Sequence, residues 1–233
     1  MATFVLVHGA GHGGWCWGRM APRLRAAGHA VLTPTLTGVG ERAHLLAPEV
    51  DLETHIADVL GVLAYEDLSE VILVGHSYGG MVVTGVADRA PQRIAQLVYL
   101  DAIIPGDGDA AADMFPRFVF DEVKVVGGVE LGLWPEPARY GVVDPNDVAW
   151  AGPRLTPHPW RSLTQPLKLR DAAAVRRIPR TIVNCAGRLD HAQGAWRERL
   201  LDAERVWEID TGHDLMITAP EAVADMLLRL TTI

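Results

Sequence analysis

The 233-residue sequence predicts an α/β fold, with a mostly parallel sheet of about six strands flanked by helices. Short runs rich in Val, Ile and Leu alternate with helix-like stretches, and the central runs are almost wholly apolar. Strands buried on both faces have this pattern, as in a parallel sheet that helices cover on each side. The six expected strands span residues 4–7, 30–32, 71–74, 97–100, 181–183 and 206–209.

Three helices can be placed between and after these strands. Apolar side chains recur at helical spacing through residues 52–63, and Asp51 stands where it can cap the first turn. A second helix is expected after Gly79. A third begins near Pro220, because proline fits a first helical turn, and it carries an apolar stripe that includes Val223 and Leu227. This last helix is expected to close the domain.

Residues 105–179 interrupt the alternation of strands and helices. They contain ten of the fifteen prolines and three of the seven tryptophans, Trp134, Trp150 and Trp160. Such a segment has enough apolar bulk to pack, so we interpret it as a small cap over the edge of the sheet. The alternative is an irregular excursion that only buries its own aromatic side chains. The predicted division is an α/β core from 1–104 and 180–233, with a cap insertion at 105–179.

Charge and cysteine content exclude some functions. The chain has 29 Asp and Glu against 21 Lys and Arg, a net charge of −8, and no basic run that could neutralise a phosphate backbone. Nucleic acid is therefore not an expected partner. Two cysteines cannot form a disulfide framework, and the first residues match neither a signal peptide nor a membrane span. We expect a cytoplasmic protein without a membrane partner; a homodimer formed through an exposed cap face stays an open alternative.

The strongest chemical signal is the sequence Gly-His-Ser-Tyr-Gly at residues 75–79, between an expected strand and an expected helix. A serine in a sharp strand-to-helix turn sits in a strained backbone conformation with its hydroxyl exposed, and small flanking glycines allow the close approach. With only three serines in the chain, a chance Gly-x-Ser-x-Gly is expected about 0.03 times. Ser77 is therefore the predicted nucleophile.

A serine hydroxyl needs a nearby base that takes its proton. His213 follows the last expected strand and precedes the terminal helix, where this architecture places its histidine. Two acids could orient that imidazole. Asp190 lies after the strand at 181–183, the usual position, but only 23 residues before His213, whereas Asp101 ends the preceding strand. Both alternatives stay open, while Asp210 and Asp214 are too close in sequence to reach around the ring.

The glycine-rich segment at residues 8–14 can present backbone N–H groups to a developing oxyanion. The expected donors are the amides of Ala10 and of Tyr78, the residue after the nucleophile. We expect His12 to shape the pocket, and Trp134 and Trp160 to contact a substrate of aromatic size, with simple packing as the alternative role. His76 is expected to face away from the site, and His55 and His158 to be surface or cap residues.

These segments, with Gly212, His213 and Asp214, resemble the α/β-hydrolase superfamily, in particular the group of plant methyl-ester esterases, salicylate-binding esterases, hydroxynitrile lyases and similar bacterial esterases. The resemblance covers almost the whole chain. It implies that Ser77 is the nucleophile, that His213 is the base and that the amides of Ala10 and Tyr78 form the oxyanion hole. The cap matches only in length and composition, so it carries over no substrate.

The chain departs from the lyases of this group, which have threonine and lysine where Gly9 and Asp214 stand here. A carboxylate beside the histidine is expected to repel cyanide. The predicted function is therefore a cofactor-free serine carboxylesterase that cleaves a small, largely apolar ester through a Ser-His-Asp triad and an acyl-enzyme. The alternatives are a non-hydrolytic tailoring enzyme (cyclase, decarboxylase or lyase) and a ligand-binding receptor on the same scaffold.

Overall fold

The computed structural model describes residues 1–114, 122–132 and 136–232. Its main sheet has six parallel strands in the order β2-β1-β3-β4-β8-β9, which confirms the α/β prediction. Each expected strand is present and extends up to three residues beyond the predicted ends. The strands are β1 (Thr3–Val7), β2 (Ala30–Leu32), β3 (Val71–His76), β4 (Ile94–Leu100), β8 (Arg180–Cys185) and β9 (Arg205–Ile209).

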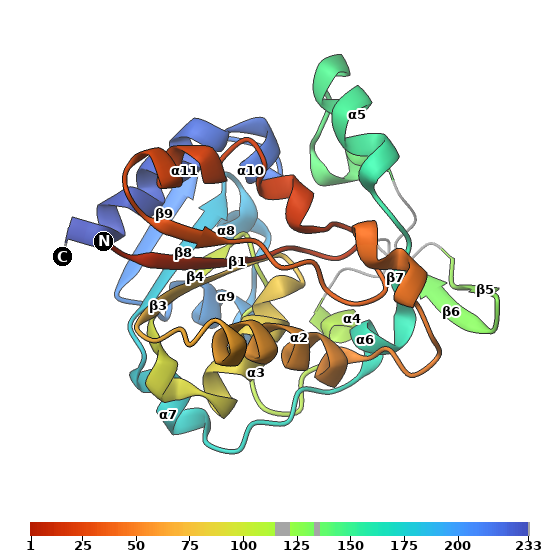
Figure 1. Cartoon of the computed structure of the whole chain (residues 1–233), viewed down its shortest axis with the longest axis horizontal. Helices are drawn as coiled ribbons and strands as arrows, with labels where there is room; N and C mark the ends of the chain where they lie inside the picture. Colours follow the sequence, from red (N-terminus) through yellow and green to blue (C-terminus); the bar gives the residue numbers. More distant parts are fainter. Residues whose placement is uncertain (115–121, 133–135, 233) are drawn as a thin grey trace.

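Helices cover both faces of this sheet (Figure 1). Alternate side chains of β1 show the two-sided burial, because Val5 and Val7 pack with the helices α2 and α3 whereas Phe4 and Leu6 pack with α1 and α11. The helices are α1 (Ala21–Ala26), α2 (Leu52–Tyr65), α3 (Gly79–Arg89), α4 (Ala111–Met114), α5 (Pro145–Ala151), α6 (Trp160–Thr164), α7 (Ala172–Arg177), α8 (Arg188–His191), α9 (Gly194–Leu201), α10 (Leu215–Thr218) and α11 (Pro220–Arg229).

Between β4 and β8 the chain forms a second, smaller sheet that the sequence analysis did not predict. This sheet is antiparallel, with the order β5 (Lys124–Val126), β6 (Val129–Gly132) and β7 (His158–Pro159). The turn between β5 and β6 is Gly127-Gly128, and both glycines have positive φ, as a two-residue hairpin turn requires. Trp134, one of the three tryptophans that supported the cap prediction, lies outside the described residues. The cap boundaries at 105 and 179 stay a prediction.

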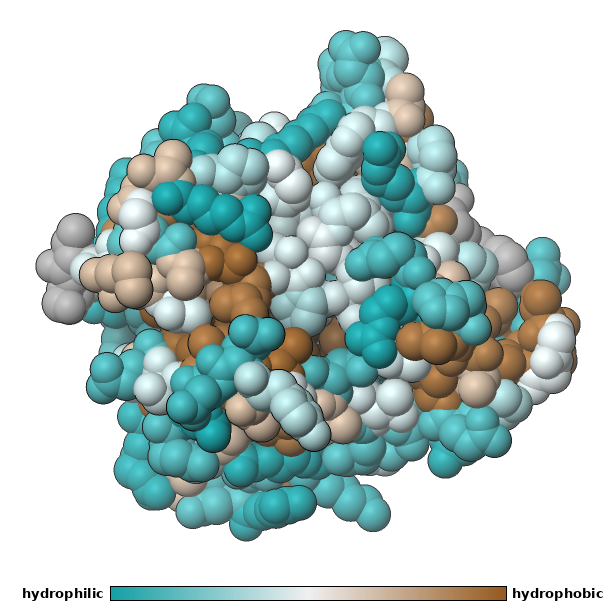
Figure 2. Space-filling view, viewed as in Figure 1, coloured by the Kyte–Doolittle hydropathy of each residue, from teal (hydrophilic) through white to brown (hydrophobic). Residues whose placement is uncertain are grey.

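The β5–β6 hairpin projects from the side of the molecule (Figure 1), and apolar residues gather on the surface there (Figure 2). Val125 is 68% exposed and Val126 is 52% exposed. No helix in the described ranges has the length and apolar character that crossing a bilayer requires.

The N-terminus of α2 confirms the expected cap. The Asp51 carboxylate accepts the N–H of Thr54 at 2.9 Å, and the Thr54 hydroxyl lies 3.4 Å from the N–H of Asp51, so the two residues form a reciprocal capping box. This matters for the site because α2 packs against α3, the helix that begins beside Ser77.

We expect Asp51→Ala to lower the free energy of unfolding by about 1 kcal/mol, because the Thr54 amide in the first turn loses its side-chain acceptor. For a chain of this size the melting temperature should fall by about 2–4 °C. Calorimetry of the variant checks this. Glu49→Ala, which removes an exposed carboxylate just before the cap, is the matched control and should leave the melting temperature unchanged; equal effects of both variants would contradict a specific role of the cap.

Candidate active site

Ser77 lies in a sharp turn between β3 and α3 with a backbone φ of +52°, in the left-handed region that non-glycine residues rarely adopt. The flanking glycines, Gly75 and Gly79, stand at positions where a side chain has no room. A Cβ atom on Gly79 would lie 2.6 Å from the Val7 carbonyl oxygen, and one on Gly75 would lie 2.8 Å from the Gly79 carbonyl oxygen. The glycines therefore allow β3, α3 and β1 to approach closely enough to form the strained turn, as the sequence predicts.

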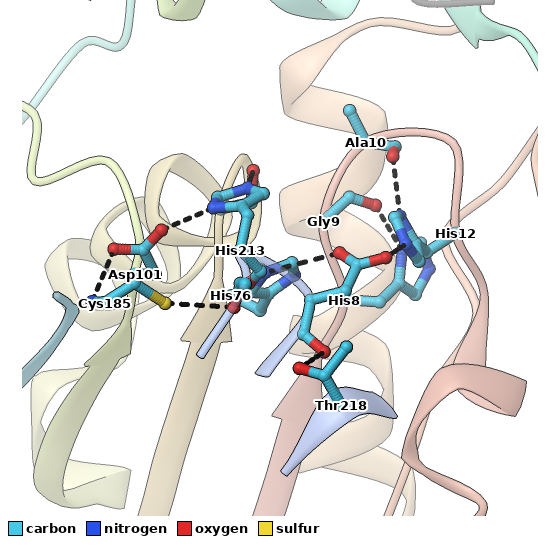
Figure 3. Close-up of polar contacts among 12 residues, drawn as sticks. His8, Gly9, Ala10, His12, His76, Asp101, Cys185, His213 and Thr218 are labelled. Carbon is cyan, nitrogen blue, oxygen red and sulfur yellow. Dashed lines mark hydrogen bonds and ion pairs between the residues drawn. The ribbon is translucent and has the colours of Figure 1, made fainter. Parts of the chain in front are cut away.

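His213 lies in the loop between β9 and α10, and the fold brings it against Ser77. The Nε2 atom of His213 is 2.9 Å from the Ser77 Oγ atom, although the residues are 136 positions apart. The other ring nitrogen, Nδ1, is 2.5 Å from Oδ2 of Asp101, as Figure 3 shows. Because a carboxylate only accepts, Nδ1 carries the proton and Nε2 is free to accept the serine hydroxyl proton.

Of the two acids that the sequence left open, the structure places Asp101 at the imidazole. Asp101 directly follows β4, and its amide donates to the Val183 carbonyl of the neighbouring strand β8 at 2.7 Å. Its φ is +43°, so it also adopts a left-handed conformation. Asp190 is exposed on α8, and the structure gives no hydrogen bond between its carboxylate and His213. The first residue of α8 instead provides a cation to Asp101.

That cation is Arg188. Its Nη1 atom is 2.6 Å from the Asp101 Oδ1 atom, and its Nη2 atom donates to the Ala102 carbonyl at 2.8 Å. The Cys185 amide also donates to Oδ1, at 3.1 Å. Burial by itself would raise the pKa of Asp101, but the Arg188 guanidinium and the hydrogen bond from His213 outweigh burial and hold the pKa far below its usual value. The sequence did not predict a role for Arg188, because its partner Asp101 is distant along the chain and no motif links the two.

The two expected oxyanion donors lie in the two turns that meet at Ser77, the one before α3 and the one after β1. Tyr78 is the residue before α3, and Ala10 lies on the glycine-rich loop after β1. Across the parts of the chain that the structure describes, neither amide donates to a protein acceptor. Gly9 makes the approach of this loop to the serine possible, because a Cβ atom there would lie 2.8 Å from the Cβ atom of Ser77.

The predicted substrate contacts are placed differently. His12 is 1% exposed, and its Nδ1 and Nε2 atoms face the Ala10 carbonyl and the Asp214 carboxylate, so both ring nitrogens are engaged within the protein. Trp160 is half-buried against the core, and a Cβ atom on Gly132 would lie 2.7 Å from its ring. Trp134 lies outside the described residues. The positions of His12 and Trp160 therefore indicate packing or positioning roles.

The burial of His55 corrects the expectation of a surface or cap position, whereas His158 lies within residues 105–179, where the cap was expected. His55 and His158 are both fully buried. His55 accepts the Tyr78 hydroxyl at Nδ1 (2.8 Å), and His158 accepts the Gly11 amide at Nδ1 (3.1 Å). His76 is buried beneath the site and donates from Nε2 to the His213 carbonyl at 2.9 Å, so it supports the loop that carries the base.

The charge beside His213 also needs correction. The expected repulsion of cyanide, which disfavoured a lyase, requires the Asp214 carboxylate to face the ligand. In the structure Asp214 is fully buried and its Oδ2 atom is 2.9 Å from Nε2 of His12. Its charge is therefore paired inside the protein, and the local argument for repulsion of cyanide does not hold.

A serine in a strained turn, a histidine within hydrogen-bond distance of it and a buried carboxylate at the other ring nitrogen have the geometry of a serine-hydrolase type of site. A family model described as "Alpha/beta hydrolase family" matches residues 4–226, so the chain belongs to this family. It is 42% identical over 243 residues to a carbendazim hydrolyzing esterase of Nocardioides sp. (strain SG-4G), covering 99% of this chain and 100% of the relative. It is 35% identical to methylesterase 7 of Arabidopsis thaliana, covering 63% and 57%.

Solved structures agree with this placement. An extracellular alpha/beta-hydrolase from a Paenibacillus species, described as a structural and functional homologue of tobacco salicylic acid binding protein 2, superposes with a TM-score of 0.83. It is 26% identical, and the similarity covers 98% of each chain. Within the α/β-hydrolase family the chain is thus a carboxylic ester hydrolase.

We expect Asp101→Asn to lower kcat by about 10³- to 10⁴-fold, because the amide no longer holds the correct imidazole tautomer. Asp190→Asn, a matched change on the exposed helix α8, should leave kcat within about twofold of wild type. Steady-state hydrolysis of a short-chain p-nitrophenyl ester by both variants is the measurement. Comparable, mild losses in the two variants would remove Asp101 from this role.

Arg188→Met should lower stability in a pH-dependent way. A carboxylate whose folded pKa is depressed adds stability above its unfolded pKa of about 3.9, and that stability is lost as pH falls through the folded pKa. Without the Arg188 guanidinium, the pKa of Asp101 in the folded protein is lowered less. The gap in unfolding free energy between wild type and variant should therefore be largest near pH 7 and narrow from pH 5 towards pH 2. Urea unfolding across this range checks the trend, and a pH-independent gap would contradict it.

Proposed function

We propose that the protein is a carboxylesterase that cleaves a small, largely apolar ester through Ser77, His213 and Asp101. The observation that carries this proposal is the pair of contacts at His213, 2.9 Å to the serine hydroxyl and 2.5 Å to the Asp101 carboxylate. Asp101 holds the proton on Nδ1, so Nε2 is oriented to accept the serine proton as the hydroxyl attacks.

The reaction then proceeds in two halves. The Ser77 oxygen adds to the ester carbonyl, its proton passes to His213, and the amides of Ala10 and Tyr78 stabilise the oxyanion. The carbon–alkoxy oxygen bond breaks, and His213 gives its proton to the leaving alcohol. Water then attacks the acyl-enzyme, gives its proton to His213 and releases the acid, and the serine recovers its proton.

The proposed substrate is a small ester without charge. Asp101 is neutralised by Arg188 and Asp214 by His12, so the pairs around the base present little net charge to a ligand. The full-length relative from Nocardioides is named for hydrolysis of carbendazim, which supports carbendazim as a second substrate to test. A panel of esters graded by acyl and alcohol size, with carbendazim included, would define the preference.

We expect Ser77→Ala to lower kcat by about 10⁴-fold or more, because the covalent route is lost. Hydrolysis of a short-chain p-nitrophenyl ester measures this. The matched control is Ser69→Ala, which removes an exposed hydroxyl between α2 and β3. Ser69→Ala should retain hydrolysis, and undiminished hydrolysis by Ser77→Ala would refute the proposal.

Covalent labelling separates this proposal from the two alternative classes. A fluorophosphonate should add to Ser77 of the wild type, and mass spectrometry of the intact protein and of its peptides locates the addition. A ligand receptor with an inert triad would label slowly or not at all. A tailoring enzyme with an activated serine would label but would not hydrolyse any ester of the panel.

A further inference from the structure

A second histidine–aspartate pair lies next to the proposed triad. The Nε2 atom of His12 is 2.9 Å from Oδ2 of Asp214, and the two side chains are 1% and 0% exposed. Figure 3 shows His12 beside Gly9 and Ala10, and the His12 and His76 ring centroids are 6.0 Å apart. His12 belongs to the oxyanion loop and Asp214 directly follows the base, so the pair joins two parts of the site that are 202 residues apart.

The hydrogen bonds of His12 require both ring nitrogens to carry protons. Nδ1 is 2.8 Å from the Ala10 carbonyl oxygen, which can only accept, and Nε2 faces the Asp214 carboxylate. His12 is therefore an imidazolium opposite a carboxylate. Burial alone would lower the pKa of His12, but the Asp214 charge and its hydrogen bond outweigh burial and raise it. The same pairing outweighs burial at Asp214 and lowers the pKa of its carboxyl.

His8, on the same loop, differs from His12 because it carries only one ring proton. The Nε2 atom of His8 accepts the Leu36 amide at 3.0 Å, so its single proton is on Nδ1, which donates to the Gly9 carbonyl at 2.8 Å. Burial lowers the pKa of His8 to about 3, so this ring stays neutral. Its hydrogen bond holds the Gly9–Ala10 peptide, the unit that carries the Ala10 N–H. His12 holds the next peptide through the Ala10 carbonyl.

Other groups complete the surroundings of the pair. His76 is 3.8 Å from the free Oδ1 atom of Asp214, and burial lowers its pKa to about 3, so it adds no charge there. The Tyr140 ring packs edge-on against His12, with centroids 5.2 Å apart, and the Tyr140 carbonyl accepts the Asp214 amide at 2.9 Å. The His12 and Asp214 charges thus balance one another, and their contact fixes the distance between the oxyanion loop and the loop of the base.

We propose that His12 and Asp214 form a buried ion pair that positions the Ala10 amide relative to His213, so that the oxyanion hole and the general base stay aligned. The inference rests on the proposed function. Both are positioning residues, because neither touches the reacting atoms. Loss of the pair should weaken interactions made only in the transition state, and so should lower kcat while leaving KM nearly unchanged.

Asp214→Asn is the first test. It leaves the shape nearly unchanged but removes the charge that keeps His12 doubly protonated, so His12 can no longer donate from both nitrogens. We expect kcat to fall at least tenfold with KM within about twofold, and the rate of fluorophosphonate labelling of Ser77 to fall in parallel. Unchanged kcat and labelling would overturn the proposal.

The matched control is Asp88→Asn. Asp88 is a second buried carboxylate, at the far end of α3, and it accepts the amides of Arg170 and Asp171 at 2.8–3.0 Å. Its substitution should lower the melting temperature without changing kcat. If Asp214→Asn behaves in the same way, with lower stability and wild-type turnover, the pair is only structural and the proposal fails.

A double variant covers the case in which Asp214→Asn does not fold. His12→Asn combined with Asp214→Asn leaves no unpaired charge, and the side-chain amide introduced at position 12 can still donate to the Ala10 carbonyl, but the direct contact between the two loops is lost. We expect a folded protein whose kcat is reduced at least tenfold. A folded double variant with wild-type kcat would overturn the proposal.

The protonation state gives a readout that does not depend on activity. In ¹⁵N spectra of labelled histidines at pH 6.5, both nitrogens of His12 should be protonated, whereas His8 should show one protonated and one bare nitrogen. A neutral His12 in an active, labelled wild type would refute the ion pair alone. A doubly protonated His12 in a wild type that neither labels nor hydrolyses any ester would instead refute the proposed function.

Discussion

The left-handed backbone at Ser77 is the constraint on which the rest of the site depends. Holding a non-glycine residue at φ +52° costs on the order of 1–3 kcal/mol, and such strain persists only where the surrounding structure enforces it. Here β3 is hydrogen-bonded to β1 on one side and β4 on the other, and α3 is buried almost along its whole length. Neither element can move to relax the turn. The serine hydroxyl is consequently held at the carboxyl end of the sheet, where the loops after β1, β4 and β9 converge.

The Asp101 carboxylate is held by residues of neighbouring strands and of the segments that follow them. Asp101 directly follows β4, which lies between β3 and β8, so its carboxylate contacts the imidazole through Oδ2 and receives donors from β8 and α8 at Oδ1. Arg188 and the Cys185 amide both bind the Oδ1 atom, which leaves Oδ2 for His213. A lone buried carboxylate would favour its neutral form; a carboxylate with these donors stays charged and keeps its geometry. The loop after β8 therefore supports the acid and does not supply it.

The sequence predicted most of the α/β framework because the central strands are short, apolar and bounded by clear helix signals. It predicted Ser77 because the Gly-x-Ser-x-Gly turn is a local sequence pattern. It predicted His213 because its place along the chain, between the last strand and the terminal helix, is enough to identify it. It could not decide between Asp101 and Asp190, since that choice depends on the direction of two loops in space. The burial of His55 and His158 was missed for a similar reason, because their partners come from distant segments. The β5–β6 hairpin could have been predicted from the sequence, because Gly127-Gly128 between valine-rich flanks is typical of a two-residue hairpin turn.

The oxyanion loop explains why so many histidines are buried in one place. Residues 9–11 of this loop are glycine and alanine, which can approach Ser77 but have no polar side chains to fix their own conformation. Other residues must hold their backbone. His8 holds the Gly9 carbonyl, His158 and the Thr156 amide hold Gly11 from the cap, and Thr35 accepts the Gly14 amide at 2.7 Å. A histidine is suited to this role because one ring can accept an amide and donate to a carbonyl at once. Two of these contacts, from His158 and Thr156, come from the segment between β4 and β8, so the conformation of the glycine-rich loop depends on how that segment packs.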